Sequence, residues 1–559
     1  MRRAGRTNRG KLGVLLFVAA GTVVFCSEER LTGEESVEAV AVAGSISGRE
    51  IFMREWLPND SRSHGGDGLG PVFNDSSCIA CHNQGGPGGA GPAGKNVDIV
   101  SAFLNNPDQF VQPRPSLTKQ LFRSLVGLDA VPARTFSKDE LEQRKEKFRK
   151  ELGKIHPGFR AARSVVLHRF ATDEKYNSWR QKMLGGNQMF FGAGFGAESF
   201  ISSENTLSGS RGITVDTRSF INPTTPERKD GKTQIKRIQR ANQEIQRIKT
   251  AVQFVNFRGN SAQHGDNVFT TNSQRNPTAL FGAGLIDSIP DEVIEAAAKK
   301  TYKDFPKVSG RVARLKDKRI GRFGWKAQKA SLHDFMLTAC AVELGLHAPN
   351  HPQSGVPSKP DYKPAGFDLN KQQCDALIDY LSNLPAPQER KPSSKPEAEF
   401  LNAGEKAFTT VGCAACHTPQ LGEADGIYTD LLVHDLGPEL GDTGSYGVFI
   451  PDSPGGESDE PFPSVTDAFA PKKAKNAQTT KIVGTNRLEW RTPPLWGVRD
   501  SAPYLHDGRA QTLEQAIASH GGEATKSARN YFMLSAKERQ QVLVFLKSLV
   551  APTQLADAN

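Results

Sequence analysis

Two short motifs contain the residue types, at the spacing, that attach a c-type haem. Residues 78–82 read CIACH and residues 413–417 read CAACH. Two thiols separated by two residues can form thioethers with the haem vinyl groups, and the adjacent imidazole can ligate the iron. The sequence therefore predicts two covalently bound haem c groups, held by Cys78, Cys81, His82, Cys413, Cys416 and His417.

A zinc site and a redox-active cysteine pair are the other interpretations of these motifs. Structural zinc requires further Cys or His pairs nearby, and a thioredoxin-like site requires a βαβ pattern around the motif. Neither pattern is found around residues 78–82 or 413–417. Chance is also a poor explanation, because the chain has only seven Cys and twelve His in 559 residues. Covalent haem is the interpretation that the pattern favours.

The first 26 residues have the composition of an export signal. Several basic residues and no acidic residue accompany an apolar run over residues 12–25, as in a signal peptide. An uncleaved membrane anchor is the alternative, although the run is short for a membrane span. We expect a periplasmic or other extracytoplasmic location, which agrees with the place where bacteria attach haem covalently. The basic residues are Arg2, Arg3, Arg6, Arg9 and Lys11.

The remaining composition limits the kind of protein that the chain can be. Without the first 26 residues the formal charge falls from +10 to about +5, which does not indicate nucleic-acid binding. The length and the 37% of hydrophobic residues predict two to four domains. The 53 Gly and 34 Pro predict long irregular connections. Cys340 and Cys374 would form a disulfide or lie buried as small apolar residues.

Charged and Pro-rich stretches indicate surface elements and a boundary. Residues 137–153 predict a solvated surface helix. Residues 224–250 predict another helix, which we interpret as an exposed insertion, with docking of an acidic redox partner as the alternative. Residues 385–399 predict a linker between domains. The Gly-rich stretch 48–98 predicts a loop that wraps the first haem, with a short helix beginning near Cys78.

A helix pattern near the end of the chain has a second copy in the middle. Residues 534–552 predict a helix that Ser535 and Glu538 cap and that carries an apolar stripe. Residues 369–387 align with it without gaps and place Asn370 at the cap. Shorter matches precede both segments in the same order, so the sequence predicts an internal repeat whose first copy contains a long insertion.

The repeat predicts that the two haems differ. In the alignment, His520 of the second copy lies opposite Ala339 of the first. His520 is therefore a candidate sixth ligand of the second haem iron, with Met533 as a weaker alternative. The first haem has an apolar residue at the corresponding position. One iron would be closed by two ligands, and the other would be open to a substrate.

These residues resemble the di-haem oxidoreductase family of peroxidases or thiol oxidoreductases. That family is related to the bacterial di-haem cytochrome c peroxidases and to the methylamine-utilisation di-haem enzyme. The resemblance extends over about residues 45–550 and is weakest over 99–260. It is carried by FGAGLIDSIPDE (281–292), GRFGWKAQ (321–328), GCAACHTPQLG (412–422), YTDLLVHDLGPELGD (428–442), EWRTPPLWG (489–497), APYLHDGRAQTLEQAI (502–517) and HGGEA (520–524).

The resemblance and the repeat together imply a mainly α fold of two cytochrome c-like haem domains with long irregular loops. The expected boundaries are a signal peptide or anchor at 1–26, a first haem domain at 45–388 with an insertion at about 99–260, a linker at 389–399 and a second haem domain at 400–552.

The resemblance implies a ligand pair for the second haem. In the relatives, the residue 14 positions after the His of the PY-hydrophobic-H-D-G motif is a Met or Tyr that ligates the C-terminal haem iron. His506 is that His in this sequence, and 14 positions on lies His520. The implied pair is therefore His417 and His520. Ligation by two imidazoles usually gives a lower reduction potential than His/Met ligation.

The resemblance also implies two catalytic residues near the first haem. Trp325 matches a Trp that lies between the haems of the relatives, and Glu343 matches a distal Glu about 20 residues later. The Asp-Gly-Arg that follows this Trp in the relatives is absent here. The alternatives are a core Trp and a solvated helix Glu.

Two further features of the relatives concern metal ligands. Some peroxidases block the N-terminal haem with a His 16 residues after the motif His, but position 98 here is Asp. A blocking ligand would have to come from far away in the sequence, such as His64, His168 or His264. The relatives also hold a calcium ion on backbone carbonyls at the place of Ser501 and Pro503.

Three functions follow as hypotheses. The first is an enzyme that reduces hydrogen peroxide at the first haem and receives electrons through the second from a small protein of the cytochrome c or cupredoxin type. Glu343 would move protons and Trp325 would carry electrons between the haems. The second is an electron carrier without a substrate site. The third is an oxidase of a protein or thiol substrate.

Overall fold

The computed structural model places the haem-motif regions in one compact unit, Ile46–Asn559. The predicted N-terminal signal or anchor lies outside the described residues. Among the residues described, no helix is long and apolar enough to cross a membrane. The structure describes residues 46–104, 138–160, 162, 164–184, 231–255, 261–264, 268–359, 362–442, 444, 446 and 484–552.

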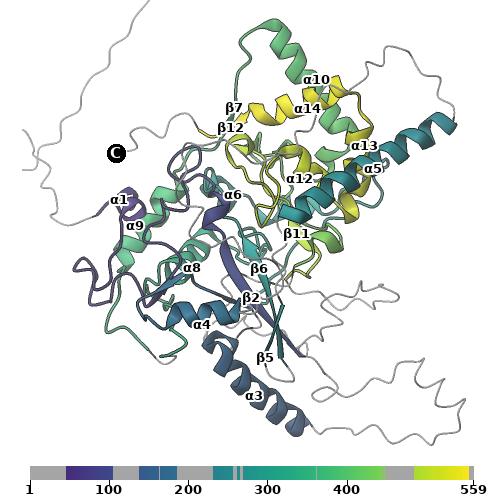
Figure 1. Ribbon diagram of the computed structural model, residues 1–559. Helices are drawn as coiled ribbons and strands as arrows, with labels where there is room; N and C mark the ends of the chain where they lie inside the picture. Colours follow the sequence, from purple (N-terminus) through teal and green to yellow (C-terminus); the bar gives the residue numbers. More distant parts are fainter. Residues whose placement is uncertain are drawn as a thin grey trace, which may run out of the picture. The chain divides into compact units, whose positions relative to one another are not determined.

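Helices form most of the regular structure, as predicted (Figure 1). The helices are α1 Gly48–Met53, α3 Lys138–Ile155, α4 Tyr176–Met183, α5 Gly231–Val255, α6 Ala283–Ser288, α7 Asp291–Ala297, α8 Leu332–Glu343, α9 Lys371–Ser382, α10 Lys395–Val411, α12 Leu513–Ser519, α13 Thr525–Met533 and α14 Ala536–Ser548. The strands are β1 Val72–Phe73, β2 Val97–Leu104, β3 Ser164–Val166, β4 Phe170–Ala171, β5 Ser261–His264, β6 Val268–Arg275, β7 Gln388–Glu389, β8 Gln420–Leu421, β9 Ala424–Asp425, β10 Val433–Asp435, β11 Glu489–Arg491 and β12 Leu549–Val550.

The two helices predicted to be alike begin in the same way. At α9 the Asn370 side chain accepts from the backbone N–H of Gln373, whose side chain bonds back to the cap. At α14 Ser535 and Glu538 form the same reciprocal capping box. Each box satisfies two backbone N–H groups that a helix end would otherwise leave without partners. The predicted N-terminal caps of both helices are therefore confirmed, whereas the helices end at Ser382 and Ser548, before the ends of the predicted segments.

The last helix packs on the helix that leads into the second haem motif. Val542 and Phe545 of α14 are fully buried, and Phe545 contacts Phe408 of α10 with ring centroids 5.5 Å apart. Figure 1 shows α10 and α14 side by side. Helix α10 ends at Gly412, which adopts a left-handed conformation and turns the chain directly into Cys413. The apolar stripe read from the sequence thus positions the motif.

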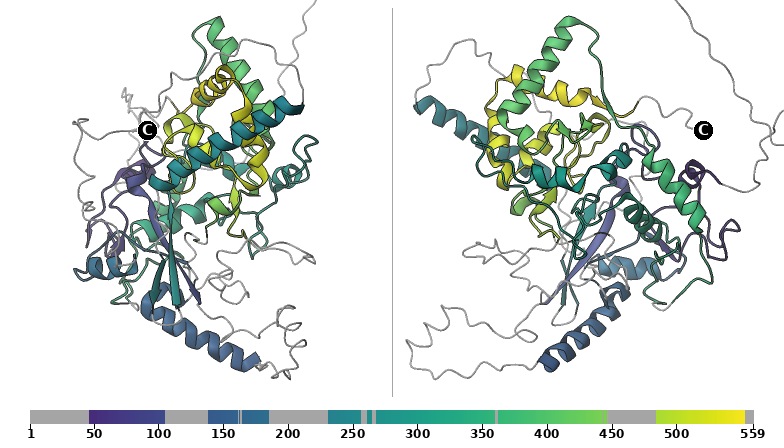
Figure 2. Two further views of the ribbon diagram at one scale, coloured as in Figure 1. Left: turned by 45° about the vertical axis from the view of Figure 1, so that its right-hand side comes forward. Right: turned by 180° about the vertical axis from the view of Figure 1, so that it is seen from behind.

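A four-stranded antiparallel sheet was not predicted. Its strand order is β3-β2-β6-β5, and β2 pairs with β6 over eight residues from Val97↔Arg275 to Leu104↔Val268. The two central strands are separated in sequence by the predicted insertion, so no local pattern joins them. Figure 2 shows β2 and β6 side by side, and Val97 and Arg275, which pair with each other, line the same pocket as Cys78 of the first haem motif.

The two charged helices differ from each other in packing. Helix α3 carries exposed charges over much of its length, as predicted. Helix α5 is not simply an exposed insertion, because Ala241 and Ile245 are buried in an apolar cluster with residues of α12, α13 and α14. One face of α5 is therefore part of the core around the second motif, and it lies across α12 and α13 in the views of Figures 1 and 2.

Short strands join the ends of the two similar helices. Strand β7 follows α9, and β12 follows α14 directly; they pair antiparallel through Leu549↔Glu389 and Val550↔Gln388. Helix α10 begins at Lys395, inside the predicted linker 389–399. Cys340 and Cys374 are both buried and form no disulfide. They occupy the apolar core of the first half, which was one of the two alternatives.

Candidate functional site

The two CxxCH motifs adopt the same turn. In the first, the backbone N–H of His82 donates to the carbonyl of Cys78 at 3.0 Å, and in the second His417 donates to Cys413 at 3.0 Å. The expected short helix beginning near Cys78 is replaced by this single turn. Two hydrogen bonds fix the spacing of the thiols and the imidazole in each motif. The residues that thioether attachment requires are thus held together locally.

Three histidines are oriented in the way that metal-binding histidines are. Because a carbonyl can only accept, a ring nitrogen bonded to it must carry the proton, which leaves Nε2 free to ligate a metal. The pairs, with their Nδ1–O distances, are His82 with Gly89 (3.2 Å), His417 with Tyr428 (3.0 Å) and His520 with Ala516 (2.7 Å). All three are the histidines predicted to ligate iron.

The protonation state of these histidines agrees with ligation. Desolvation lowers the pKa of His82 and His520 below the usual range and that of His417 to about 4. A lowered pKa keeps the imidazole neutral at neutral pH, and only the neutral ring has the lone pair that binds a metal. Each of the three side chains is half-buried and lines a pocket.

A pocket at the second motif, called the second pocket below, is lined by both His417 and His520. Their ring centroids are 6.5 Å apart with an interplanar angle of 61°. Two imidazoles that hold one metal from opposite sides at about 2 Å each have centroids about 6 Å apart. The pair therefore fits an iron between its rings. Met533, the alternative, packs in the apolar cluster of α14 and does not line this pocket.

The first pocket brings the first motif together with α8. Cys78, Cys81 and His82 line it, as do Ala339 and Glu343. Its lining among the described residues contains no second histidine. The remote histidines whose side chains are described bond elsewhere: His64 to Gln373 and Asn370, and His168 to the carbonyl of Val342. The side chain of His264 lies outside the described residues.

Glu343 faces this pocket with a perturbed carboxyl. Asn74 Nδ2 donates to Oε2 at 2.6 Å, while Oε1 is buried without a hydrogen-bond partner in the described part of the chain. Desolvation raises the pKa of Glu343 above that of an exposed Glu, although hydrogen bonds from Tyr446 and Asn74 oppose the shift. A raised pKa allows a carboxyl to carry a proton near neutral pH. Glu343 is therefore not a solvated helix residue.

Sequence reasoning missed Tyr446, which completes this pocket. Its hydroxyl bonds to Glu343, and its ring lies 6.3 Å from that of Phe335 on α8. Tyr446 follows the second motif in sequence, yet it lines the pocket of the first. No motif or spacing indicates this contact, because the residue comes from the other half of the chain.

Trp325 lines both pockets. Its Nε1 donates to the carbonyl of Asn276 at 2.9 Å, and its own carbonyl accepts from the backbone N–H of Arg491 at 3.1 Å. These contacts fix the indole from both halves of the chain. The alternative of a core Trp packed away from the sites does not match this position.

A second tryptophan, Trp490, lies in a cationic environment that was not predicted. The Lys326 ammonium lies 3.6 Å from its ring centroid and the Arg275 guanidinium 5.1 Å, and the His506 ring stacks on it at 3.7 Å. Burial lowers the pKa of Lys326 to about 7. Trp490 lines only the second pocket of the two. The Arg275 guanidinium, and the Lys326 amine whenever it is protonated, make removal of an electron from Trp490 harder than from Trp325.

A buried histidine next to the second motif was also missed. His434 Nε2 bonds to Asp430 at 2.9 Å and Nδ1 to Glu523 at 2.8 Å, and these carboxylates raise the pKa of His434 well above its usual value. Cys416, Asp430 and His434 form the one cluster of three metal-ligand side chains in the described residues. It lacks the fourth ligand that is typical of structural zinc.

Comparison with known proteins supports the family resemblance. Residues 477–549 match the profile of a family described as "Di-haem oxidoreductase, putative peroxidase". Over 146 residues the chain is 31% identical to the methylamine utilization protein MauG of Methylorubrum extorquens, covering 25% of this chain and 31% of MauG. Over 193 residues it is 27% identical to the hydrazine synthase subunit gamma of Kuenenia stuttgartiensis, covering 33% of this chain and 50% of that protein. The resemblance expected from the sequence is thereby confirmed.

Solved structures of the same kinds of protein are also matched. A hydrazine synthase of Kuenenia stuttgartiensis pressurised with xenon matches at 17% identity and a TM-score of 0.24, covering 47% of this chain and 88% of that chain. A MauG-like protein associated with microbial copper homeostasis matches at 16% identity and a TM-score of 0.25, covering 49% of this chain and 92% of that chain. The chain spans 31% and 50% of the lengths of the two curated relatives that it matches.

Proposed function

Since the chain is a relative of the di-haem oxidoreductases, we propose that it is an exported di-haem c-type enzyme that reduces hydrogen peroxide. The peroxide site is at the first motif, and electrons enter at the second. One observation carries the proposal: His417 faces His520 across its pocket, whereas the pocket of His82 has Ala339 and Glu343 on α8 and no second histidine among its described lining.

The residues of the chain suit two covalent haems. Cys78 and Cys81, and likewise Cys413 and Cys416, would form the thioethers, while His82, His417 and His520 would ligate the irons through Nε2. The bound haem would supply the iron redox chemistry for peroxide reduction. The buried Oε1 of Gln84 has no hydrogen-bond partner in the described part of the chain, and Gln84 Nε2 donates to the carbonyl of Ala502. Oxygen atoms at this point support a calcium ion beside Ser501 and Pro503.

Glu343 is the proposed proton carrier. Reduction of peroxide to water requires a proton on the leaving oxygen, and a carboxyl with a raised pKa retains its proton at a higher pH than an exposed Glu. Its free Oε1 provides an atom from which the proton can pass to a molecule in the pocket. Tyr446 and Asn74 hold the carboxyl in place from two different segments.

Trp325 is the proposed electron bridge. It lines both pockets, and backbone contacts from Asn276 and Arg491 hold it. The donor would be a small protein of the cytochrome c or cupredoxin type.

The two haem domains, 45–388 and 400–552, and their internal repeat are part of the proposal. The similar capping boxes of α9 and α14 support the repeat.

The experiment is a spin-state measurement followed by peroxide addition. We expect one high-spin and one low-spin ferric haem, and a spectral change at the high-spin haem on adding peroxide. Turnover with a reduced donor should follow. Two low-spin haems with no response to peroxide would support an electron carrier instead. Turnover with a protein or thiol substrate but with no peroxide-reducing activity from a reduced donor would support the oxidase.

A further inference from the structure

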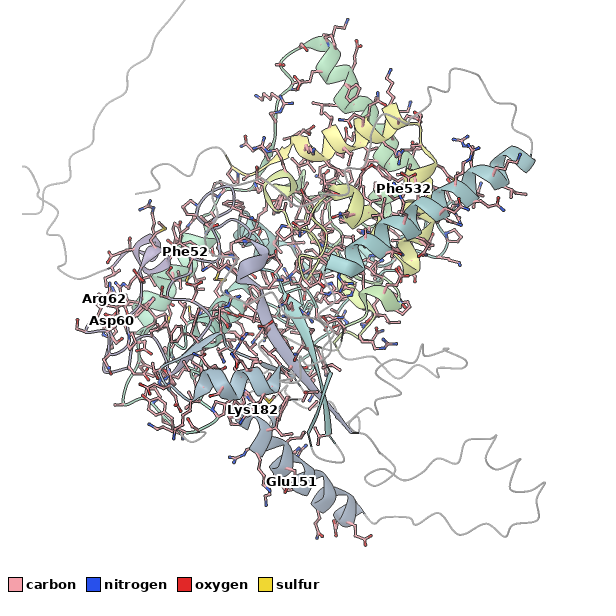
Figure 3. The ribbon with its side chains drawn as sticks, viewed as in Figure 1. Phe52, Asp60, Arg62, Glu151, Lys182 and Phe532 are labelled. Atoms are coloured by element: carbon pink, nitrogen blue, oxygen red, sulfur yellow. The ribbon has the colours of Figure 1, made fainter. Side chains whose placement is uncertain are left out.

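Helix α5 covers the second haem site from outside. It contacts α12 and α13, and α12 ends directly before His520. Ala241 and Ile245 of α5 are buried with Phe532 of α13 in one apolar cluster. Figure 3 shows Phe532 where α13 passes beneath α5. A protein seated on the outer face of α5 would therefore lie over the helices that carry the proposed iron ligand.

Polar contacts fasten α5 in this position. Arg539 Nη1 donates to Glu244 at 2.8 Å, and Arg237 Nη2 donates to the carbonyl of Met533 at 2.8 Å. Lys249 Nζ lies 2.6 Å from Glu439. Glu244 is the only acidic residue of α5, and Arg539 neutralises it. The outward face of the helix consequently has no negative charge of its own.

The outward face of α5 is basic. Lys236, Arg240 and Arg247 are exposed and are spaced by four and by seven residues, which places them on one side of a helix. Buried Ala241 and Ile245 lie on the opposite side. None of the three cations has an ion pair with a described residue. Ile235, which is 56% exposed, adds an apolar contact at the same end of the helix.

Helix α3 shows that this pattern is not a general property of the charged segments. The two exposed lysines of α3 whose side chains are described are paired within the helix: Lys150 with Glu146 at 3.9 Å and Lys154 with Glu151 at 2.8 Å. Leu152 anchors it in a different apolar cluster, away from the residues that pack under α5. Of the two charged helices, α5 therefore carries the unpaired positive charges near the second haem site, and α3 does not show this pattern among its described side chains.

We propose that this basic face, defined by Lys236, Arg240 and Arg247, is the docking surface for an acidic electron-donor protein. The proposal rests on the function proposed above and names the class of donor. Unpaired cations attract an acidic partner and orient it, while leaving the complex weak enough to dissociate after transfer. Each encounter oxidises one donor molecule by one electron. Two encounters and two protons reduce one hydrogen peroxide to two waters.

The test is stopped-flow reduction of the full di-haem protein by flavodoxin hydroquinone, an acidic one-electron donor of low potential, at low ionic strength and without peroxide. The variant is the triple charge reversal Lys236→Glu, Arg240→Glu and Arg247→Glu. We expect its second-order rate constant to fall by about tenfold or more, and the wild-type rate to fall with added salt more steeply than that of the variant.

The matched control reverses three exposed lysines elsewhere, Lys150→Glu, Lys154→Glu and Lys182→Glu. Lys150 and Lys154 lie on α3, and Lys182 lies on α4. Figure 3 labels Lys182 and also Glu151, which follows Lys150 in the sequence. The control changes the net charge by the same amount, so an equal loss of rate in both variants would overturn the proposal. An unchanged rate in the α5 variant would also overturn it.

Two readouts separate docking from folding and from peroxidase activity. Reduction by dithionite should proceed equally in wild type and both variants, which shows that the second haem is intact. Because no peroxide is present, the docking result does not depend on peroxide chemistry. A protein that flavodoxin reduces normally but that never turns over peroxide would refute the peroxidase proposal and leave the docking surface supported.

Discussion

The two motifs have the same local structure but open into different pockets. His82 and His417 make the same turn and the same type of hydrogen bond from Nδ1 to a carbonyl. Beyond the imidazole, one pocket presents the apolar Ala339 and the acidic Glu343, and the other presents His520. The comparison teaches that the two motifs alone do not distinguish the sites, whereas the element across each pocket would determine whether a proposed iron is free to react.

Substitutions of Ala339 and His520, the residues across the two pockets from the motif histidines, should have the largest effect on haem spin state and peroxide reactivity. In Ala339→His the first haem should become low-spin and peroxide reactivity should be lost, because an imidazole on α8 would close the open position. In His520→Ala only the second haem should become high-spin. Electron paramagnetic resonance of both ferric variants measures the change. If His520→Ala altered the first haem instead, the assignment of the two pockets would be wrong.

Removing the carboxyl of the open pocket should have the next largest effect. Glu343→Gln should slow the peroxide reaction by about 100-fold or more and leave haem content intact, because the amide cannot deliver the proton. A matched control is Glu405→Gln on α10, which bonds to Tyr428 in the other half. Rapid-mixing spectroscopy gives the rates, and equal rates for Glu343→Gln and wild type would contradict the role of Glu343.

The pH dependence sharpens this prediction. The protonated carboxyl is the active form, so the wild-type rate should fall as pH rises through the raised pKa of Glu343. The hydrogen bond from Tyr446 lowers that pKa, so Tyr446→Phe should move the decline to higher pH. Glu343→Gln should abolish it. A decline at the same pH in all three proteins would show that another group titrates.

Substitution of Trp325, the proposed bridge between the pockets, should have a smaller effect on the reaction than the substitutions within either pocket. Trp325→Phe should slow electron transfer between the haems on the order of tenfold, equivalent to about 1.4 kcal/mol on the barrier. Trp490→Phe is the matched control, since Trp490 lines only the second pocket and lies beside two cations. Flash reduction of the second haem measures the rate. Equal slowing in both variants would remove the distinction between the two indoles.

The similar helix caps should give the smallest effects. Asn370→Ala and Ser535→Ala should each lower the free energy of unfolding by about 1 kcal/mol, because each removes one capping hydrogen bond. Thermal unfolding followed by circular dichroism measures the loss. Haem spectra should not change in either variant, and a change confined to one of them would show that the two helices are not equivalent.

Features that depend on residues close in sequence were predictable. The CxxCH turns, the capping boxes of α9 and α14 and the apolar stripe of α14 each lie within a few residues of the pattern that indicates them. The pairing of His417 with His520 was accessible through the repeat and the family resemblance, although the two residues are far apart. The position of Trp325 was inferred from the resemblance in the same way.

Features that depend on distant contacts were not predictable. The β2–β6 pairing joins strands on either side of the insertion, and short-range periodicity does not encode a partner. Tyr446 carries no motif, and its contact with Glu343 depends on how the second half folds over the first. The buried face of α5 was obscured by its many charges, since Ala241, Ile245 and Val252 are the only buried residues among its described side chains.

The shared lining of the pockets has a consequence for biogenesis. Tyr446 of the second half lines the pocket of the first motif, and Phe323 and Trp325 of the first half line the pocket of the second. Neither half therefore contains a complete cavity when it is synthesised alone. If haem is attached as proposed, the attachment machinery would meet the first motif before the second half has completed its pocket. Gene fragments that encode single halves should yield cytochromes with incompletely enclosed cofactors.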